Sequence, residues 1–267
     1  MKLKSYLFSF LFFFISFSSF AQNWQMIWSE EFNYTGLPDS TKWTNEVGLI
    51  RNNELQYYTK NRIENNWVAN GQLKIIGRKE SYKGSEYTSA SITTDQQFTC
   101  TYGKIEANIK VPIGQGMWPA FWMLGSNFKT AGWPACGEID ILENTGSHPF
   151  QIQGTIHGPD YSGENGVTKI IQAQRPLSED FNNYAISWNE NSIEWFFNGV
   201  SYNKISKTDP ALAGKDWPFN QEFYLIINLA IGGWFPGEVD PDLVQAELQV
   251  DWIKYYSENG VGELFLH

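Results

Sequence analysis

Three carboxylic acids fall within six residues of one short segment, GEIDILENTG at 137–146. Glu138 and Asp140 stand two positions apart, so both would project from the same face of a β-strand. Glu143 follows Glu138 by five positions, and a regular strand would send it to the opposite face. Carboxylic acids held close together can serve as acid and base in one reaction, because burial and mutual repulsion separate their pKa values.

A β-bulge around Ile141–Leu142 would return Glu143 to the face of the other two acids. A bulge adds one residue to a strand and is frequent beside active sites. The alternative is a strand that ends before Glu143. With the bulge, Glu138 and Glu143 lie roughly 13 Å apart along the strand. Side chains that lean together could reduce this to the ~5–5.5 Å of a retaining glycosidase, and a wider, inverting separation stays open.

In a retaining glycosidase Glu138 would be the nucleophile, Glu143 the acid and base, and Asp140 a partner of the nucleophile. Two other interpretations are a solvated acidic strand and a calcium site, which would prefer acids in a flexible loop. The acids stand near Trp133 and Cys136 and among apolar residues, which favours a functional cluster.

The elements that must position these acids are β-strands. Apolar and polar residues alternate at 104–111, 151–157, 186–202 and 250–253, and Asn198-Gly199 is a strong hairpin signal. Long amphipathic helices and βαβ alternation are absent from the sequence. The pattern predicts an all-β fold, a jelly-roll sandwich of two antiparallel sheets. We expect one domain over 22–267, with 257–267 as a loose tail.

The first 21 residues have the pattern of a signal peptide. Lys2 and Lys4 precede an apolar run that ends at Ser19-Phe20-Ala21. A membrane anchor is the alternative, but the apolar stretch is short and rich in serine. We therefore expect a secreted protein, extracellular or periplasmic, without membrane contact after cleavage.

Composition narrows the class of ligand. The formal net charge of −10 argues against nucleic acid and anionic membranes, and it disfavours polyanionic substrates. Three histidines without metal-ligand spacing make a zinc or iron site unfavourable. Cys100 and Cys136 could form one disulfide or stay as buried thiols. The 12 Trp and 13 Tyr residues suit a core and a surface that stacks on sugar rings.

Several segments together resemble glycoside hydrolase family 16, in its laminarinase-type form. GEIDILE at 137–143 is similar to the bulged E-x-D-x-x-E active-site strand of that family. Other similar segments are GQGMWPAFWML at 114–124, NNELQYYT at 52–59, NLAIGGWFPG at 228–237, VDWIKYY at 250–256 and EEF at 30–32.

The resemblance implies a jelly-roll with a concave cleft and retaining endo-hydrolysis of a neutral β-glucan, mainly at β-1,3 linkages. Nucleophile, assisting acid and acid/base then fall on Glu138, Asp140 and Glu143. Sugar contacts are implied at Trp118, Trp122, Trp133, Trp234, Asn53, Arg78 and His157. No cofactor is implied for catalysis, and a monomer is expected. A structural calcium on the convex side would involve Glu31, Gly71 and Asp251.

Other functions stay open at this point. The enzyme could also cleave mixed β-1,3/1,4-glucan, or instead a galactan such as agar, porphyran or carrageenan. Transglycosylation differs from hydrolysis only in the acceptor. A non-catalytic glucan-binding protein on the same fold is disfavoured, because such a protein needs neither Glu138 nor Glu143.

Overall fold

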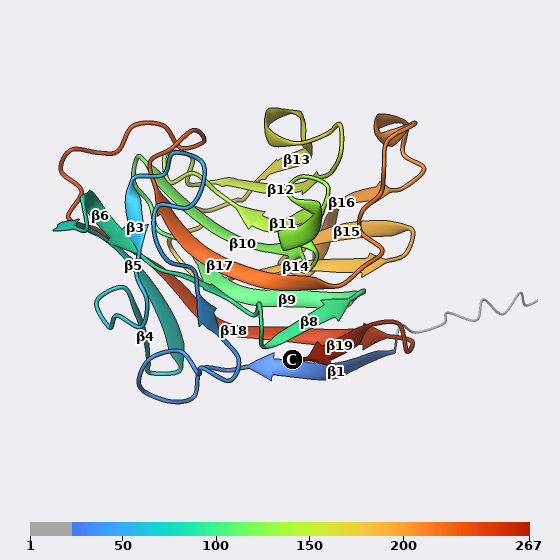
Figure 1. Cartoon of the computed structure of the whole chain (residues 1–267), viewed down its shortest axis with the longest axis horizontal. Helices are drawn as coiled ribbons and strands as arrows, with labels where there is room; N and C mark the ends of the chain where they lie inside the picture. The colour runs from blue at the N-terminus through green and yellow to red at the C-terminus, as the bar shows by residue number, and fades with distance from the viewer. Residues whose placement is uncertain (1–22) are drawn as a thin grey trace, which may run out of the picture.

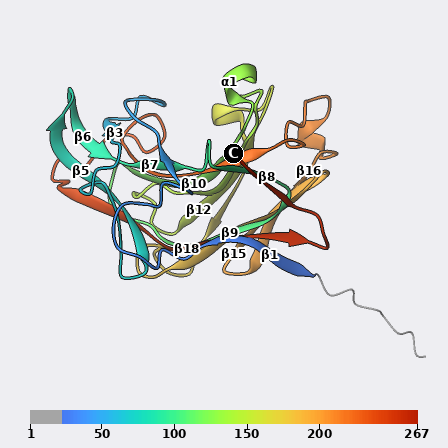
Figure 2. The same ribbon diagram turned by 60° about the horizontal axis from the view of Figure 1, so that its bottom comes forward.

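Two twisted β-sheets lie face to face in the computed structural model, which describes residues 23–267. Figures 1 and 2 show the sheets as two layers, with the long strands of one stacked over those of the other. The signal peptide predicted at 1–21 lies outside the described residues, so it stays a prediction, as does the secreted location that depends on it.

The first sheet has ten strands and forms the layer without the three acids. Neighbouring strands are antiparallel except for the parallel pair β3 and β6. Its order is β16 (Val200–Ser206), β15 (Ser192–Phe197), β14 (Asn182–Asn189), β9 (Gly103–Lys110), β18 (Gln245–Glu258), β5 (Gln72–Tyr82), β6 (Ser85–Ser89) and β3 (Gln56–Tyr58), while β1 (Trp24–Glu30) pairs with β18 and β4 (Asn66–Ala69) with β5.

The second sheet has nine strands and carries the three acids. Its order is β13 (Val167–Gln172), β12 (Gln151–His157), β11 (Glu138–Glu143), β10 (Met117–Gly125), β17 (Phe223–Ile231), β7 (Ser91–Thr93) and β2 (Thr44–Asn45), with β8 (Phe98–Thr101) joining β17 to β19 (Glu263–Leu266). This arrangement confirms the predicted all-β sandwich of two antiparallel-dominated sheets.

Alternation along the strands divides the side chains between two environments. In β10, Phe121 and Met123 belong to the main core between the sheets, whereas Trp122 and Leu124 belong to a smaller buried cluster on the other face. In β12 the inward residues Ile152 and Ile156 are fully buried, as the sequence pattern predicts. The central strands are therefore covered on both faces, and their outer face is the floor of a cavity rather than open surface.

Turn chemistry agrees with the sequence at the hairpin that joins β15 to β16. Asn198 and Gly199 both have positive φ, 48° and 77°, the conformation that a tight two-residue hairpin requires. The expectation of a loose tail was wrong. β18 continues to Glu258, and β19 pairs with β8 in the register Glu263↔Thr101 to Leu266↔Phe98. Backbone pairing with an otherwise open strand stabilises this segment.

In the part of the chain that the structure describes, helical structure is limited to three short segments, α1 (Phe128–Ala131), η1 (Gly163–Asn165) and η2 (Pro210–Leu212). Figure 2 shows α1 standing above the acid-bearing sheet, close to β10. Within residues 23–267, no helix has the length and apolar character needed to cross a bilayer. Both cysteines are buried free thiols.

Candidate active site

The bulge predicted in β11 is present. Against β10, Leu142 pairs with Phe121 and Asp140 with Trp122, so Ile141 is the extra residue. Against β12 the register also shifts between Asp140 and Glu143. Ile141 and Leu142 both lie in the main core. Because two successive apolar residues are directed inward, Glu143 returns to the outer face, where all three acids line one cavity.

Burial raises the pKa of each acid well above the ordinary carboxyl range. For Glu138 and Glu143 burial acts first, and the neighbouring Asp140 carboxyl adds to it, so both pKa values rise to about 8. The pKa of Asp140, which is 2% exposed, also rises to about 8 through burial. The three close carboxyls therefore titrate as a coupled set, which carries fewer than three negative charges near neutral pH.

Glu138 and Asp140 share a histidine from the neighbouring strand. His157 stands opposite Glu138 in the register of β11 and β12. Its Nε2 lies 3.2 Å from Asp140 Oδ2 and 3.6 Å from Glu138 Oε1. The Trp133 indole N–H donates to Glu138 Oε2 at 2.9 Å. Glu138 therefore has a donor on one oxygen and an imidazole near the other, which favours its ionised form.

The backbone beneath these acids is also fixed. The Trp195 indole N–H, from β15 of the opposite sheet, donates to the main-chain oxygen of Asp140 at 2.8 Å. A Cβ at Gly154 would approach the Trp195 ring to within 2.6 Å. Glycine in β12 thus lets this tryptophan reach the backbone next to the bulge.

Glu143 has a different set of partners. The Trp118 indole N–H donates to Glu143 Oε1 at 3.1 Å, and the Gln153 amide lies 3.4 Å from Oε2. Both partners are neutral, and Glu143 is 8% exposed. A carboxyl in such surroundings retains its proton more readily than one beside a cation.

These groups line what we call the acid cleft, a cavity of about 470 Å³ over β11, β10 and β17 and beside the loop at 46–54. Trp122 forms part of its floor, and its indole N–H donates to Asn228 Oδ1 at 2.8 Å. Asn228 donates in turn to the Tyr58 hydroxyl at 3.0 Å. An apolar floor with a few fixed polar groups is typical of sites for small molecules and sugar units.

Arg51 is a cleft residue that the sequence did not indicate. Its guanidinium lies 4.9 Å from the centre of the Trp122 ring. It pairs with Glu46 through two nitrogens, and its Nε lies 3.9 Å from Glu54. The available signal was a single arginine between two glutamates in NEVGLIRNNE. The sequence signal for Asn228 was clearer, because Asn228 is the single amide or charged residue of the nine-residue strand FYLIINLAI.

Three of the four tryptophans expected to bind sugar lie in the acid cleft. Trp118, Trp122 and Trp133 line the acid cleft. Trp234 does not line it. Its side chain is 75% exposed on the loop after β17, and its backbone N–H donates to the carbonyl of Asn52 at 3.1 Å.

The polar residues expected to bind sugar are mostly elsewhere. Asn53 is exposed and outside the cleft lining, and its neighbour Asn52 lines the cleft instead. His157 contacts the acids rather than the open cavity. Arg78 lies on β5 of the other sheet, where it donates to Gln245 at 3.2 Å. Its position on a strand of the opposite layer removes it from the site.

The predicted calcium position finds little support in its side chains. Glu31 lies 3.3 Å from Lys254 Nζ, and Asp251 accepts from the Asn108 amide at 3.0 Å. Both carboxylates therefore have partners that compete with a cation. Gly71 would contribute only a main-chain carbonyl, so the calcium site stays a prediction.

The arrangement can perform acid–base chemistry on a neutral ligand. It offers one carboxyl with stabilising donors, Glu138, and one in neutral surroundings, Glu143. Aromatic rings and an arginine stand around them in a concave cavity. Such an asymmetric pair of carboxyls is what the hydrolysis of a glycosidic bond requires.

Comparison with known proteins agrees with this geometry. The family model described as "Glycosyl hydrolases family 16" matches residues 42–254. A beta-glucanase of Rhodothermus marinus is 42% identical over 246 residues, which cover 88% of this chain and 86% of the relative. Glucan endo-1,3-beta-glucosidase A1 of Niallia circulans is 33% identical and much longer, so that the alignment covers 87% of this chain and 38% of that protein.

Solved structures are equally close. The catalytic domain of an endo-1,3-beta-glucanase (laminarinase) from Thermotoga petrophila RKU-1 superposes with a TM-score of 0.83 and 40% identity, covering 89% of this chain and 99% of that domain. The chain therefore belongs to glycosyl hydrolases family 16.

Proposed function

We propose that this protein is a retaining endo-glycosidase that hydrolyses β-1,3-glucan, with Glu138 as nucleophile and Glu143 as acid and base. The observation that carries the proposal is the bulge at Ile141, which brings all three acids to one cleft. The substrate class is supported by the similar proteins, which are a beta-glucanase and a glucan endo-1,3-beta-glucosidase.

The first half-reaction breaks the glycosidic bond. The ionised Glu138 carboxylate attacks the anomeric carbon while the bond to the leaving oxygen breaks, and Glu143 gives its proton to that oxygen. The donor from Trp133 keeps Glu138 oriented and ionised. Asp140 lies beside the nucleophile, and burial raises its own pKa to about 8, so the pair carries fewer than two negative charges near neutral pH.

The second half-reaction releases the sugar. Glu143, now ionised, removes a proton from a water molecule, which attacks the anomeric carbon and breaks the ester bond to Glu138. Both groups return to their starting protonation states. Trp118 and Gln153, which hydrogen-bond to Glu143, keep its carboxyl directed into the cleft in both steps.

The test is a substrate panel with analysis of the first product. The purified protein is incubated with laminarin, mixed-linkage β-glucan, agarose, porphyran and carrageenan, and reducing ends are followed. Early products are examined by proton NMR for their anomeric form. We expect internal cleavage of laminarin and initial release of the β-anomer, with the Glu138→Gln protein as a control for contaminating activity.

Three results would overturn the proposal. Initial release of the α-anomer would mean an inverting enzyme and a different role for Glu138. Cleavage of a galactan alone would show that the substrate is a galactan and not a β-glucan. Binding of laminarin without cleavage of any polymer would mean a glucan-binding protein.

A further inference from the structure

One histidine and two carboxylates come together beside the acid cleft in an arrangement that can hold a metal ion. Glu138, Asp140 and His157 each offer one oxygen or nitrogen, and these three atoms all lie within 4.8 Å of one another. Within residues 23–267, no other group of three histidines, cysteines or acids is gathered in this way. The sequence argued against a zinc site because these positions follow no metal-ligand spacing, and the pairing of β11 with β12 brings them together.

The distances in the cluster fit a small tetrahedral ion. His157 Nε2 lies 3.2 Å from Asp140 Oδ2 and 3.6 Å from Glu138 Oε1. A tetrahedral zinc ion that is bound at about 2.0–2.2 Å separates its ligand atoms by roughly 3.3–3.6 Å. An ion among these three atoms therefore requires little movement of the side chains.

The Asp140 carboxyl gives an independent sign that a cation fits here. Its side chain is 3% accessible, and its Oδ2 accepts no hydrogen bond from any group of residues 23–267. A buried carboxyl oxygen in this state costs free energy unless a proton or a cation compensates it. The His157 ring nitrogen lies 3.2 Å away without forming a hydrogen bond to it. A cation between the oxygen and the nitrogen would bind both.

The remaining contacts leave the atoms of the cluster accessible to an ion. Trp133 donates to Glu138 Oε2, so Oε1 is the oxygen beside His157. Glu138 and Asp140 line the acid cleft, so a fourth position on the ion would open toward water or a sugar hydroxyl. Gly166 makes room for the imidazole, because a Cβ there would lie 2.7 Å from His157 Nδ1.

The types of ligand select the class of ion. Calcium takes six to eight oxygen ligands, and magnesium demands a near-ideal octahedron. An imidazole nitrogen with two carboxylates suits zinc and copper(II) better. Metal-binding histidines usually donate their second ring nitrogen to an acceptor, whereas His157 Nδ1 has no hydrogen-bond partner in the described chain. We therefore expect reversible binding rather than a permanently held ion.

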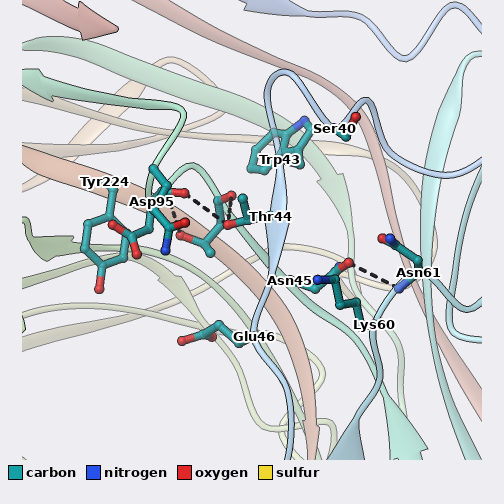
Figure 3. Close-up of a pocket in the computed structure, with 11 residues that line it drawn as sticks. Ser40, Trp43, Thr44, Asn45, Glu46, Lys60, Asn61, Asp95 and Tyr224 are labelled. Carbon is teal, nitrogen blue, oxygen red and sulfur yellow. Dashed lines mark hydrogen bonds between the residues drawn. The ribbon is translucent and has the colours of Figure 1, made fainter. Parts of the chain in front are cut away.

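Acids in the neighbouring cavity do not offer such a site. Figure 3 shows Glu46 and Asp95 in the cavity that adjoins the acid cleft. Glu46 pairs with Arg51, and Asp95 lies 3.4 Å from Lys129 Nζ. These carboxylates would have to give up a basic partner in order to bind a metal ion. The two acids beside His157 have no lysine or arginine partner in the described part of the chain.

We propose that Glu138, Asp140 and His157 bind a single zinc or copper(II) ion, and that this ion inhibits hydrolysis. The ion binds Glu138 Oε1 and thereby keeps the carboxylate from the anomeric carbon. The binding site itself stands on the geometry of the three side chains. The inhibition rests on the proposed function, because that function makes Glu138 the nucleophile.

Calorimetric titration of the purified, untagged protein with zinc chloride measures the binding. The protein is first treated with a chelator, which is then removed. We expect one ion per molecule, and we expect calcium and magnesium to bind at least about tenfold more weakly. Cobalt(II) gives a second measurement on the unmodified protein, because its visible absorption is much stronger in a four-coordinate site than in water.

Two variants remove ligands, and two others serve as controls. His157→Gln and Glu138→Gln should each weaken zinc binding at least about tenfold, since even the loss of a group that supports a ligand costs about 10–100-fold in affinity. His148→Gln removes an exposed histidine, and Asp95→Asn removes a carboxylate of the neighbouring cavity. Both controls should leave the zinc affinity unchanged.

Inhibition is measured on laminarin at a low substrate concentration while zinc is added. We expect the zinc concentration that halves the rate to agree with the dissociation constant from calorimetry. Removal of zinc by EDTA should restore the rate. Agreement of the two values would show that the ion that binds is also the ion that inhibits.

The inference is overturned if zinc does not bind in a one-to-one ratio, or if cobalt(II) shows only the weak absorption of a six-coordinate ion. It is also overturned if both ligand variants bind zinc as tightly as the unmodified protein. Stoichiometric binding without inhibition would overturn the inhibitory role. Failure of the proposed function gives a different result, because a protein that cleaves no polymer would still bind zinc in the calorimeter.

Discussion

β9 and β11 have similar sequences and different surroundings. KIEANIK at 104–110 and EIDILE at 138–143 both alternate apolar residues with charged or polar ones. Their glutamates are also similarly exposed, with 13% of the side chain of Glu106 and 17% of that of Glu138 accessible. Exposure alone therefore does not separate a structural glutamate from a candidate catalytic one.

The partners of the two glutamates do separate them. Glu106 lies 2.6 Å from Lys104 Nζ and stands opposite Lys254 in the register with β18. Glu138 has an indole, an imidazole and two other carboxyls around it. A lysine partner fixes a carboxylate in its charged form, whereas neighbouring acids in a buried cleft raise the pKa. The comparison shows that similar strands differ in chemistry because of what faces them.

The largest expected effect is the loss of activity on replacing either glutamate of the cleft. Glu138→Gln and Glu143→Gln should each lower kcat on laminarin at least about a thousandfold, because each removes one partner of the acid–base pair. Glu106→Gln on β9 is the matched control and should stay within twofold of the unmodified protein, measured by release of reducing ends. A comparable loss in the control would refute the contrast between the strands.

A smaller loss is expected from removing the bulge. Deleting Ile141 leaves EIDLE, in which the glutamates stand four apart and share one face of a regular strand. The deletion removes a fully buried side chain, so we expect the free energy of unfolding to fall by about 2–5 kcal/mol. We expect activity at least about tenfold above that of Glu138→Gln.

The deletion separates two roles of the bulge. Circular dichroism shows whether the deletion variant is folded. If it is folded but no more active than Glu138→Gln, the bulge must determine more about the position of Glu143 than the face of the strand on which it lies. Measurable activity would show that its role is to bring Glu143 to the cleft side.

The pH dependence of stability should also distinguish the two strands. Burial and Asp140 raise the pKa of Glu138 from 4.5 to about 8. The stability associated with the protonated form is present below pH 4.5 and is lost as the pH rises through about 8. Glu138→Gln avoids this loss, so its Tm relative to the unmodified protein should increase over that range.

The expected increase in this Tm difference is a few degrees, since a change of ~1 kcal/mol in the free energy of unfolding shifts Tm by roughly 2–4 °C in a chain of this size. Scanning calorimetry at several pH values measures it, with Glu106→Gln as the comparison. A Tm difference for Glu138→Gln that is flat with pH would contradict the raised pKa.

The smallest expected effect is a shift of the pH–rate profile in His157→Gln. His157 lowers the pKa values of Glu138 and Glu143, acting against burial. Without it these pKa values rise, less Glu138 is ionised at a given pH, and the acidic limb of kcat/KM moves to higher pH. His148→Gln, in the loop after β11, serves as the control. A shift to lower pH would contradict this account of His157.

Much of the fold could be predicted from the sequence, because period-two alternation and the Asn198-Gly199 turn are local signals. The acids and the bulge were predictable for the same reason, since a spacing of five positions between the two glutamates leaves few ways for both to share a face. The tail was misjudged because β19 is stabilised by pairing with β8, about 160 residues earlier in the chain. No local pattern reports such a pairing.

The surroundings of the acids could be predicted only in part. Arg51 comes from a loop, and Asn228 and Tyr224 come from β17. Their meeting depends on strand order, which the sequence pattern does not specify. Arg78 was misassigned for the same reason. The sequence pattern predicts that Arg78 lies on a strand, but it does not specify which of the two sheets that strand joins.

The sequence by itself determined which groups could react, through the types and spacing of Glu138, Asp140 and Glu143. Only the tertiary structure decided their protonation and their partners. A pKa depends on burial and on nearby charges, and both come here from strands β10, β12 and β17 and from the loop at 46–54. β17 and the loop at 46–54 lie far from the acids along the chain, and all of these segments contact the acids only when the sheet forms.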